Sequence, residues 1–396
     1  MAKFSQFPVG PRLIALAKDE LHTRLERRLG QMAHNNEIQE EMLSLDVDQQ
    51  LEVFGRTISP SDEEEVLART REFLNWRFAS AHEVIESASW LRIDRIGMRM
   101  LNTTALSGAE CVYLRLLITG AGEKNVKFVM IDEVQDYTET QLMVLGKYFS
   151  RAHFLLLGDS NQAIWEDTAT FEQIEKIFTA THGEGAVSTC KLLTSYRSSP
   201  EITALFTSLL SEEERGQTSS VQRGGKKPEF FEVVADNKDT ERAEYLQTMK
   251  SLIEQAQEFD GLTAIVCTEK SRVRWLAKQL EGVFAESGNG TADGATDGVA
   301  DNGAAQANGA AQAKLCTGVK VLTSHDSLPA KGVVLLDLAL AKGLEFDQVI
   351  VADAQEEVYK ADGISRRRLY TALSRAMHHV MVVSQGKMTP LLSKLL

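Results

Sequence analysis

The spacing of apolar side chains divides the chain into two kinds of sequence. Up to about residue 122, apolar residues recur every three or four positions, which is the period of a helix that buries one face. Leu25 and Leu29 lie on one such face, and Ser61 with Glu64 forms a capping-box pattern before an acidic run that suits a helix start. The pattern therefore predicts a helical region over residues 1–122, whose leucine and aromatic stripes we interpret as core packing.

From residue 126 onward the sequence changes to short apolar runs. The runs at 126–131 and 154–157 flank a stretch with helical spacing at 138–149, which together predict a strand, a helix and a second strand of a parallel sheet. Further strands are expected at 262–267, 319–323, 333–340, 349–352 and 380–383, and helices at 239–256, 270–282 and 365–377. The alternation indicates the α/β class with parallel sheets.

One low-complexity segment interrupts this alternation. Residues 287–313 comprise 27 residues, of which 15 are Gly or Ala, without a basic or large apolar side chain. Such a composition cannot bury enough apolar surface to offset the entropy lost on ordering. We interpret it as a disordered insertion within an α/β domain, and the stretch at 224–227 as a shorter linker.

Composition narrows the class of protein. The chain of 396 residues is long enough for two or three domains, and it has no run of about 20 apolar residues that could span a membrane. The first residues lack the pattern of a signal peptide. The four cysteines lie far apart without a CxxC pair, so the sequence predicts neither a disulfide framework nor a cysteine zinc site and favours a reducing cytoplasm. A net charge of −13 argues against nucleic-acid binding through bulk charge but permits a local basic groove.

The strongest chemical signal is an acidic pair that directly follows the first apolar run. Asp132 and Glu133 stand at the expected carboxyl end of a parallel strand, where α/β proteins bind ligands. This is the Walker B arrangement, in which Asp132 would hold a nucleotide-bound Mg²⁺ and Glu133 would position and deprotonate the attacking water. By itself the pair is equally consistent with a solvated turn.

The next strand end carries Gly158-Asp159-Ser160-Asn161-Gln162. The amide of Gln162 can donate to a γ-phosphate and accept from water. Trp165 follows closely and can stack on a nucleic-acid base, although a buried structural tryptophan is the alternative.

Further along the chain, two segments carry groups suited to a nucleotide. Tyr196 can stack on adenine, and Arg197 can reach a terminal phosphate with its planar guanidinium. Lys342 and Gly343 can approach a phosphate backbone, and Glu345 a ribose or the bound nucleotide.

A third segment is locally basic in this acidic chain. Three arginines, 366–368, open an expected helix that also carries Arg375. Arg368 and Arg375 are seven residues apart and are therefore expected on one helix face. A solvated helix start is the default interpretation of the three arginines.

In combination and in this order, the segments DEVQD, GDSNQ, SYRS, AKGLEFDQVIV and RRLYTALSRA resemble motifs II to VI of UvrD/Rep-type superfamily 1 helicases. The phrases IDEVQDYTETQLMVL, LLGDSNQAIW and LAKGLEFDQVI are most similar to the helicase IV branch and to the HelD-type factors that recycle bacterial RNA polymerase. The resemblance covers residues 106–383. It implies RecA-like lobes that close over ATP and Mg²⁺ and step along single-stranded or partly duplex DNA.

The resemblance also implies roles for the residues that match its motifs. Around the nucleotide these are Asp132 for Mg²⁺, Glu133 as catalytic base, Gln162 and Arg197 at the γ-phosphate, Tyr196 on adenine, Gly343 and Glu345 beside the nucleotide, and Arg375 as an arginine finger. Trp165 and Lys342 would contact the nucleic acid. The implied protein is a cytoplasmic ATP-dependent DNA helicase.

The sequence departs from the family at its phosphate-binding loop. The family needs GxxxxGK[ST], whose amides and lysine cradle the β- and γ-phosphates. The three Gly-Lys pairs of this chain, at 146–147, 225–226 and 386–387, are followed by Tyr, Lys and Met, so none forms this loop. The segment 337–341 also reads DLALA where the family has a threonine-leucine-histidine entry.

We therefore interpret the chain as the C-terminal portion of such a motor. Residues 1–122 would be a helical region like domain 1B, 123–198 the remainder of the first RecA-like lobe, and 199–396 the second lobe with its insertion. We expect this chain to be inactive unless an upstream segment supplies the P-loop. Two alternatives stay open: a non-catalytic module that docks on RNA polymerase or nucleic acid, and an α/β nucleotide-binding fold of another function.

Overall fold

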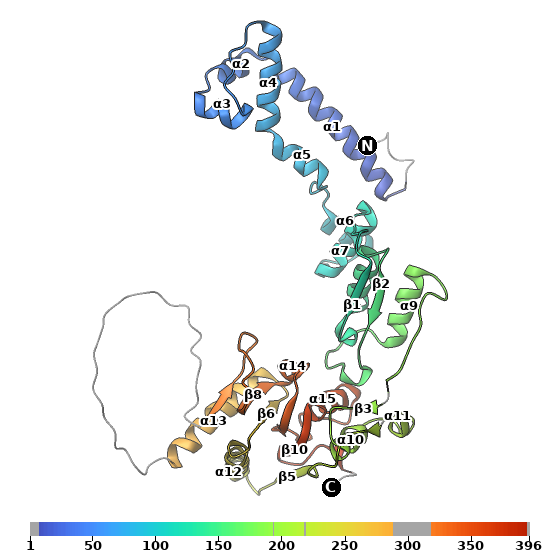
Figure 1. The fold of residues 1–396 in the computed structure, drawn as a ribbon, viewed down its shortest axis with the longest axis vertical. Helices are drawn as coiled ribbons and strands as arrows, with labels where there is room; N and C mark the ends of the chain where they lie inside the picture. Colours follow the sequence, from blue (N-terminus) through green and yellow to red (C-terminus); the bar gives the residue numbers. More distant parts are fainter. Residues whose placement is uncertain (1–7, 193, 218, 288–317, 394–396) are drawn as a thin grey trace, which may run out of the picture. The chain divides into compact units, whose positions relative to one another are not determined.

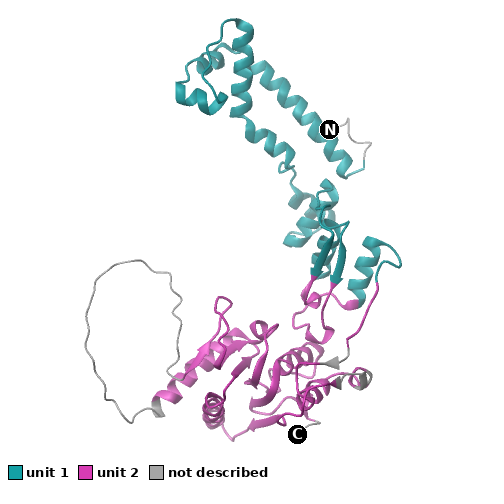
Figure 2. Ribbon diagram, in the orientation of Figure 1, with its two compact units in different colours: residues 1–130, 138–155, 172–187 teal, residues 131–137, 156–171, 188–396 magenta. Residues whose placement is uncertain are grey.

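The computed structural model describes residues 8–192, 194–217, 219–287 and 318–393. They form two compact units that interleave along the chain (Figure 2). Unit 1 comprises Met1–Met130, Thr138–Leu155 and Glu172–Val187, and unit 2 comprises Ile131–Tyr137, Leu156–Phe171 and Ser188–Leu396. The predicted division at residues 122 and 198 into a helical region and two lobes stays a prediction. The expected disordered insertion, 287–313, lies outside the described residues except for its first residue.

Unit 1 begins with helices, as the apolar spacing predicted (Figure 1). They are α1 (Pro11–Met32), α2 (Asn36–Leu43), α3 (Val47–Phe54), α4 (Glu63–Arg77), α5 (Ala79–Glu86), α6 (Ile93–Leu101) and α7 (Gly108–Thr119). The predicted stripe of α1 is packed, because Leu29 is buried against Leu74 of α4 and Leu25 lies partly buried beside them. A second small core joins α1, α6 and α7 through Ile14, Ile93 and Ile118.

The start of α4 differs by one residue from the predicted capping box. The N-cap is Asp62, whose carboxylate accepts a hydrogen bond from the Glu65 amide at 2.7 Å. The Ser61 hydroxyl instead donates to the Glu65 carboxylate at 3.0 Å. Both Ser and Asp are good N-caps, and only the path of the backbone before the first turn decides between neighbours.

The rest of unit 1 is built on a small parallel sheet. Its elements are β1 (Phe128–Ile131), α8 (Glu139–Tyr148), β2 (His153–Leu156) and α9 (Phe171–His182). His153 N donates to Lys127 O and Leu157 N donates to Ile131 O, both at 2.8 Å, so the two strands run in the same direction. The helices α8 and α9 bury one face, where the rings of Phe154 and Phe178 lie 4.9 Å apart.

The other face of this sheet is open. The side chains of Phe128 and Met130 on β1 are 75% and 71% exposed, and Leu155 on β2 is also exposed. Parallel strands are normally covered on both faces, because their crossover helices pack on each side. This apolar face of the unit 1 sheet therefore lacks the covering layer that parallel strands normally have.

Unit 2 contains a six-stranded sheet in the order β5-β10-β9-β6-β8-β7. The strands are β5 (Glu229–Val233), β6 (Leu262–Cys267), β7 (Val319–Val321), β8 (Gly332–Asp337), β9 (Phe346–Val351) and β10 (Ala376–Gln385), and every pairing is parallel. The predicted parallel α/β class is thus confirmed. Two further short strands, β3 (Thr194–Ser195) and β4 (Ser219–Ser220), pair separately.

Helices cover both faces of the six-stranded sheet. The helices are α10 (Pro200–Thr207), α11 (Glu212–Gln217), α12 (Lys238–Gln257), α13 (Lys270–Ser287), α14 (Leu338–Ala341) and α15 (Gly363–Leu373). Alternating residues of β6 point to opposite cores: Ala264 and Val266 pack with α10 and α15, whereas Ile265 packs with α12 and α13. Strand β6 is buried along its whole length, as its unbroken apolar run suggested.

Two expected elements end earlier than the apolar runs suggested. Strand β8 stops at Asp337, whose carboxylate accepts from Leu340 N at 3.1 Å and so caps the single turn α14. Helix α15 stops at Leu373, so Arg375 lies in the turn before β10 and does not share a helix face with Arg368. None of the helices in the described ranges is long and apolar enough to cross a membrane.

A buried carboxyl group stands where β9 and β6 end. Asp353 is 1% exposed, and its Oδ2 accepts from the Thr268 amide at 2.8 Å. Burial, the largest influence, raises the pKa of Asp353 to about 6, although the bonds from Thr268 and the charge of Arg272 oppose the shift. The folded protein therefore holds a proton at this position over a pH range in which the unfolded chain has lost it.

We expect the contribution of Asp353 to the stability of the protein to fall as pH rises from about 4 through 6, because ionised Asp353 is disfavoured only in the folded state. Asp353→Asn removes this contribution, so the unfolding free energy of the variant relative to the parent rises across that range by about 3 kcal/mol at most. Urea unfolding between pH 4 and 7 measures it, with Asp260→Asn as an exposed-carboxylate control. Parallel curves for the parent and Asp353→Asn would contradict the expectation.

Candidate nucleotide and nucleic-acid site

The predicted acidic pair lies at the carboxyl end of β1. Asp132 is exposed, and its Oδ1 accepts from the Glu133 amide at 2.8 Å. Glu133 has φ +52° and ψ +42°, a left-handed conformation that residues other than glycine seldom adopt. It begins the short 3-10 helix η2 (Val134–Asp136). The pair is therefore a backbone-constrained turn at the strand end where ligands bind in parallel sheets.

A buried glutamine connects this turn to the end of β2. Gln135 is 1% exposed, its Nε2 donates to Glu133 Oε2 at 2.5 Å, and its Oε1 accepts from Asp159 N at 3.1 Å. Sequence reasoning assigned no role to Gln135, although it stands inside the DEVQD segment. Its position between Val134 and Asp136 gives no signal of burial, so only the structure shows its part in the site.

The amide of Gln162 is fully engaged in this structure. It ends the short 3-10 helix η3 (Ser160–Gln162), where its Nε2 donates to Asp159 Oδ2 at 2.9 Å. Its Oε1 accepts from Arg375 Nη2 at 2.7 Å. The structure therefore brings together two residues that are 213 positions apart and that the sequence placed at one site.

Arg375 is almost completely buried, at 2% exposure. Its Nε donates to Thr371 O at 3.2 Å and its Nη1 to Leu344 O at 3.4 Å, in addition to the bond with Gln162. Burial lowers the pKa of Arg375 most, Arg197 lowers it further, and the carboxylates of Glu133, Glu345 and Asp159 oppose this. Because an arginine stays charged in proteins, the result is a buried cation held by carbonyl and amide oxygens.

Lys342 lies against the acidic turn. Its Nζ donates to Asp136 Oδ1 and to Gln162 O, each at 2.6 Å, and lies 3.8 Å from Glu133 Oε2. Only 6% of its side chain is exposed. The predicted contact of Lys342 with nucleic acid stays a prediction, and it requires these bonds to open.

The remaining predicted nucleotide contacts are at the surface. Arg197 Nη2 lies 2.6 Å from Glu345 Oε1, with both side chains 43% exposed. Tyr196 is 71% exposed. Gly343 has φ +80°, a conformation that favours glycine and lets the chain turn between Lys342 and Glu345. The two oppositely charged groups assigned to the nucleotide are thus paired with each other here.

Trp165 is 49% exposed, which does not fit the alternative of a buried structural tryptophan. Two arginines of α15 donate hydrogen bonds to the backbone just before Trp165. Arg367 Nε donates to Ala163 O at 2.8 Å, and Arg368 Nε donates to Ile164 O at 3.1 Å. These two arginines were interpreted from sequence as a solvated helix start, and their role in fixing this loop was missed.

The described residues contain no cluster of three or more His, Cys, Asp or Glu side chains that could hold a metal ion. Mg²⁺ in nucleotide sites commonly uses one or two carboxylates, with phosphates and water completing its six ligands. The single exposed carboxylate of Asp132 fits that mode and does not fit a metal cage built only from protein.

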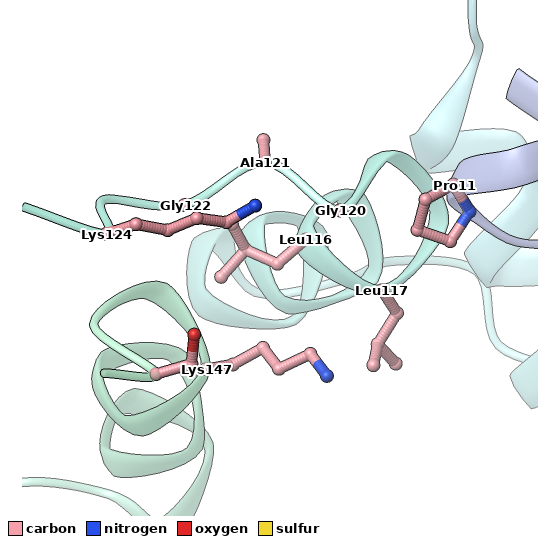
Figure 3. Close-up of a pocket in the computed structure, with 9 residues that line it drawn as sticks. Pro11, Leu116, Leu117, Gly120, Ala121, Gly122, Lys124 and Lys147 are labelled. Carbon is pink, nitrogen blue, oxygen red and sulfur yellow. The ribbon is translucent and has the colours of Figure 1, made fainter. Parts of the chain in front are cut away.

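Unit 1 contains a hollow (Figure 3). Its lining includes Pro11, Leu116, Leu117, Gly120, Ala121, Gly122, Lys124, Lys147 and Ser150. Lys124 precedes β1 and Lys147 belongs to the last turn of α8, which precedes β2. The hollow is therefore at the amino ends of these strands, opposite the end that carries Asp132.

Comparison with protein families identifies two segments of the chain. Residues 91–177 match the UvrD/REP helicase N-terminal domain, and residues 332–383 match the UvrD-like helicase C-terminal domain. The chain therefore contains UvrD/REP-like helicase domains, as the order of its motifs suggested. Among curated proteins, none matches the chain.

Two solved structures are similar over parts of the chain. One is the C-terminal domain of a possible DNA helicase from Lactobacillus plantarum, with 27% identity over 51% of this chain and 94% of that chain and a TM-score of 0.32. The other is S. cerevisiae Dbp5 bound to RNA and ADP-BeF3, with 11% identity over 69% of this chain and 56% of that chain and a TM-score of 0.36. The low TM-scores carry no argument about function.

Replacing Lys342 tests the contacts of this site. We expect Lys342→Met to lower the unfolding free energy by about 1–3 kcal/mol, because Asp136 and the Gln162 carbonyl lose their donor. Urea unfolding measures the change. Lys278→Met, which removes an exposed ammonium from α13, is the control and should change stability little. Equal stability of Lys342→Met and the parent would mean that the bonds of Lys342 are not formed in solution.

Proposed function

We propose that the chain is the C-terminal portion of a UvrD-like ATP-dependent DNA motor, closest to the helicase IV and HelD-like branch. The observation that carries the proposal is the direct hydrogen bond between Gln162 and Arg375, together with the bonds that connect Gln162 through Asp159 and Gln135 to Glu133. These groups come from three distant segments, and each matches a motif that the family uses for ATP hydrolysis. The matched helicase domains support the same conclusion.

The proposed chemistry assigns one task to each group. ATP with Mg²⁺ supplies the phosphoryl group that is transferred to water. Asp132 holds the metal, and Glu133 orients the attacking water and accepts its proton. Arg375 and Arg197 stabilise the negative charge that develops on the phosphates, as guanidinium groups do in related phosphoryl transfers. For this, Arg197 must leave Glu345, and Arg375 must exchange its bond with Gln162 for a phosphate oxygen.

We propose further that the phosphate cradle comes from polypeptide outside these 396 residues. The sequence contains no GxxxxGK[ST]. The open face of Phe128, Met130 and Leu155 supports this proposal, because a two-stranded parallel sheet needs further strands and helices to be stable. A strand and helix that carry the P-loop would cover that face.

The proposed nucleic-acid contact is Trp165. Its ring is half exposed on a loop fixed by Arg367 and Arg368, and it follows Gln162 by three residues. Aromatic side chains in single-strand channels contribute about 1–3 kcal/mol per stacked base. Because only three residues separate Gln162 from Trp165, a change at the nucleotide site would alter the binding of DNA.

We expect no ATP turnover above background from the 396-residue chain alone, with or without single-stranded DNA. Without the cradle, nothing positions the β- and γ-phosphates against Glu133. A coupled phosphate-release assay measures the rate. Robust DNA-stimulated turnover that Glu133→Gln abolishes would show that the chain is a complete ATPase.

For DNA binding, Trp165→Ala should weaken the affinity for an oligothymidine by about 5- to 150-fold, the equivalent of one stacked base. Fluorescence anisotropy of a labelled oligonucleotide measures it at fixed low salt. The matched control is Trp76→Ala, which removes another exposed indole from α4. Unchanged binding by Trp165→Ala, or an equal loss in both variants, would argue against the stacking role.

A non-catalytic module that docks on RNA polymerase is the second candidate. It is favoured by the ion pairs of Arg197 with Glu345 and of Lys342 with Asp136. With these charges already neutralised, the site is stable without a nucleotide. Pull-down with purified RNA polymerase separates the two. A stoichiometric complex that persists without nucleotide or DNA favours docking, and its absence together with DNA binding favours the motor.

A further inference from the structure

A line of hydrogen bonds crosses the candidate site. It runs from Glu133 Oε2 to Gln135 Nε2, from Gln135 Oε1 to Asp159 N, from Asp159 Oδ2 to Gln162 Nε2, and from Gln162 Oε1 to Arg375 Nη2. Each side-chain amide in the line uses its NH₂ group on one side and its oxygen on the other. The line therefore fixes the orientation of both glutamines, because neither amide can flip without losing two bonds.

The first member of the line is held in an unfavourable backbone conformation. A left-handed conformation is unfavourable for a residue other than glycine and persists only where its surroundings determine it. Glu133 is such a residue, and the bond from Gln135 is one of the contacts that secures its side chain. Strain of this kind at a proposed water-activating carboxylate suggests a geometry kept for function.

The close approach of Gly158 to Gln135 shows how tightly this amide is placed. A Cβ atom at residue 158 would lie 2.2 Å from Gln135 Oε1 and 3.1 Å from a side-chain carbon of Val134. Only glycine therefore leaves room for the Gln135 amide to reach both Glu133 and Asp159. The glycine of the GDSNQ segment has a steric role that the sequence did not reveal.

We propose that Gln135 is a positioning residue that orients the carboxylate of Glu133 and links it to Asp159. The proposal rests on the proposed role of Glu133 as the base. Gln135 touches neither phosphate nor water in this role and acts only through its neighbours. Hydrogen bonds through Gln162, Asp159 and Gln135 connect Arg375 to Glu133. A movement of Arg375 would therefore change the position of the Glu133 carboxylate.

The competing explanation is that Gln135 only fills space in the interior. The two explanations differ in what a carboxylate at this position would meet. Gln135→Glu keeps the size and the acceptor for Asp159 N, but it replaces the NH₂ donor with a second carboxylate facing Glu133. An ionised carboxylate only accepts hydrogen bonds, so this variant loses the bond to Glu133 and places two like charges side by side.

Other charged groups face this pair and are common to every variant. Lys342 Nζ lies 3.8 Å from Glu133 Oε2, Asp132 is the preceding residue, and Arg375 acts on Glu133 through space. Asp159 meets Gln135 through its backbone amide. The cycle includes the single variant Glu133→Gln, so the effect of these groups on Glu133 is measured separately from its contact with residue 135.

The test is a double-mutant cycle in the full chain with Gln135→Glu, Glu133→Gln and both together. Urea unfolding is followed at one fixed, near-neutral pH. We expect the unfolding equilibrium constant of Gln135→Glu to exceed that of the parent at least 10-fold. Glu133→Gln in the same chain should remove most of that increase, because the exchanged pair again joins one carboxylate to one amide.

The unfolding experiment tests the proposal without nucleotide or DNA. An equal increase in Gln135→Glu and the double variant, or no increase in Gln135→Glu, would overturn the proposal. If Gln135→Glu does not fold, a folded double variant supports the proposal and an unfolded one overturns it. Because no turnover is measured, the result is independent of whether the proposed ATPase function stands.

Discussion

The organisation of the candidate site depends on one buried cation. The guanidinium of Arg375 is removed from water and can remain so only because carbonyl oxygens and the amide oxygen of Gln162 surround it. This requirement ties the turn after α15 to the loop after β2. Once that contact is made, Arg367 and Arg368 on the same helix reach the next two carbonyls, and the loop that presents Trp165 becomes defined.

Around this contact, the charged groups of the site satisfy one another. Lys342 neutralises the acidic turn, Arg197 pairs with Glu345, and the amide of Gln162 is used on both sides. Such pairing lowers the free energy of the site without ligand, so any phosphate that binds must replace existing bonds. The same arrangement suits a motor waiting for its nucleotide and a module that never binds one.

The two sheets show what a parallel sheet requires. In unit 2, helices cover both faces, and strands β6, β8 and β9 are buried almost throughout. In unit 1, helices cover one face, and Phe128 and Met130 remain in water on the other. Parallel strands with apolar residues on both faces are stable only when a layer of structure covers each face. The proposal of a further strand and helix rests on this open face.

The sequence by itself determined the parallel α/β class and the helical start, because apolar periodicity records which face of each element is buried. It also gave the positions of Asp132, Glu133 and Gln162. It could not place Gln135, Arg367 and Arg368 in the site, end β8 at Asp337, or move Arg375 off its helix. Those outcomes depend on which distant donors and acceptors the fold brings within about 3 Å of each other, and a buried polar group takes its partner from tertiary structure.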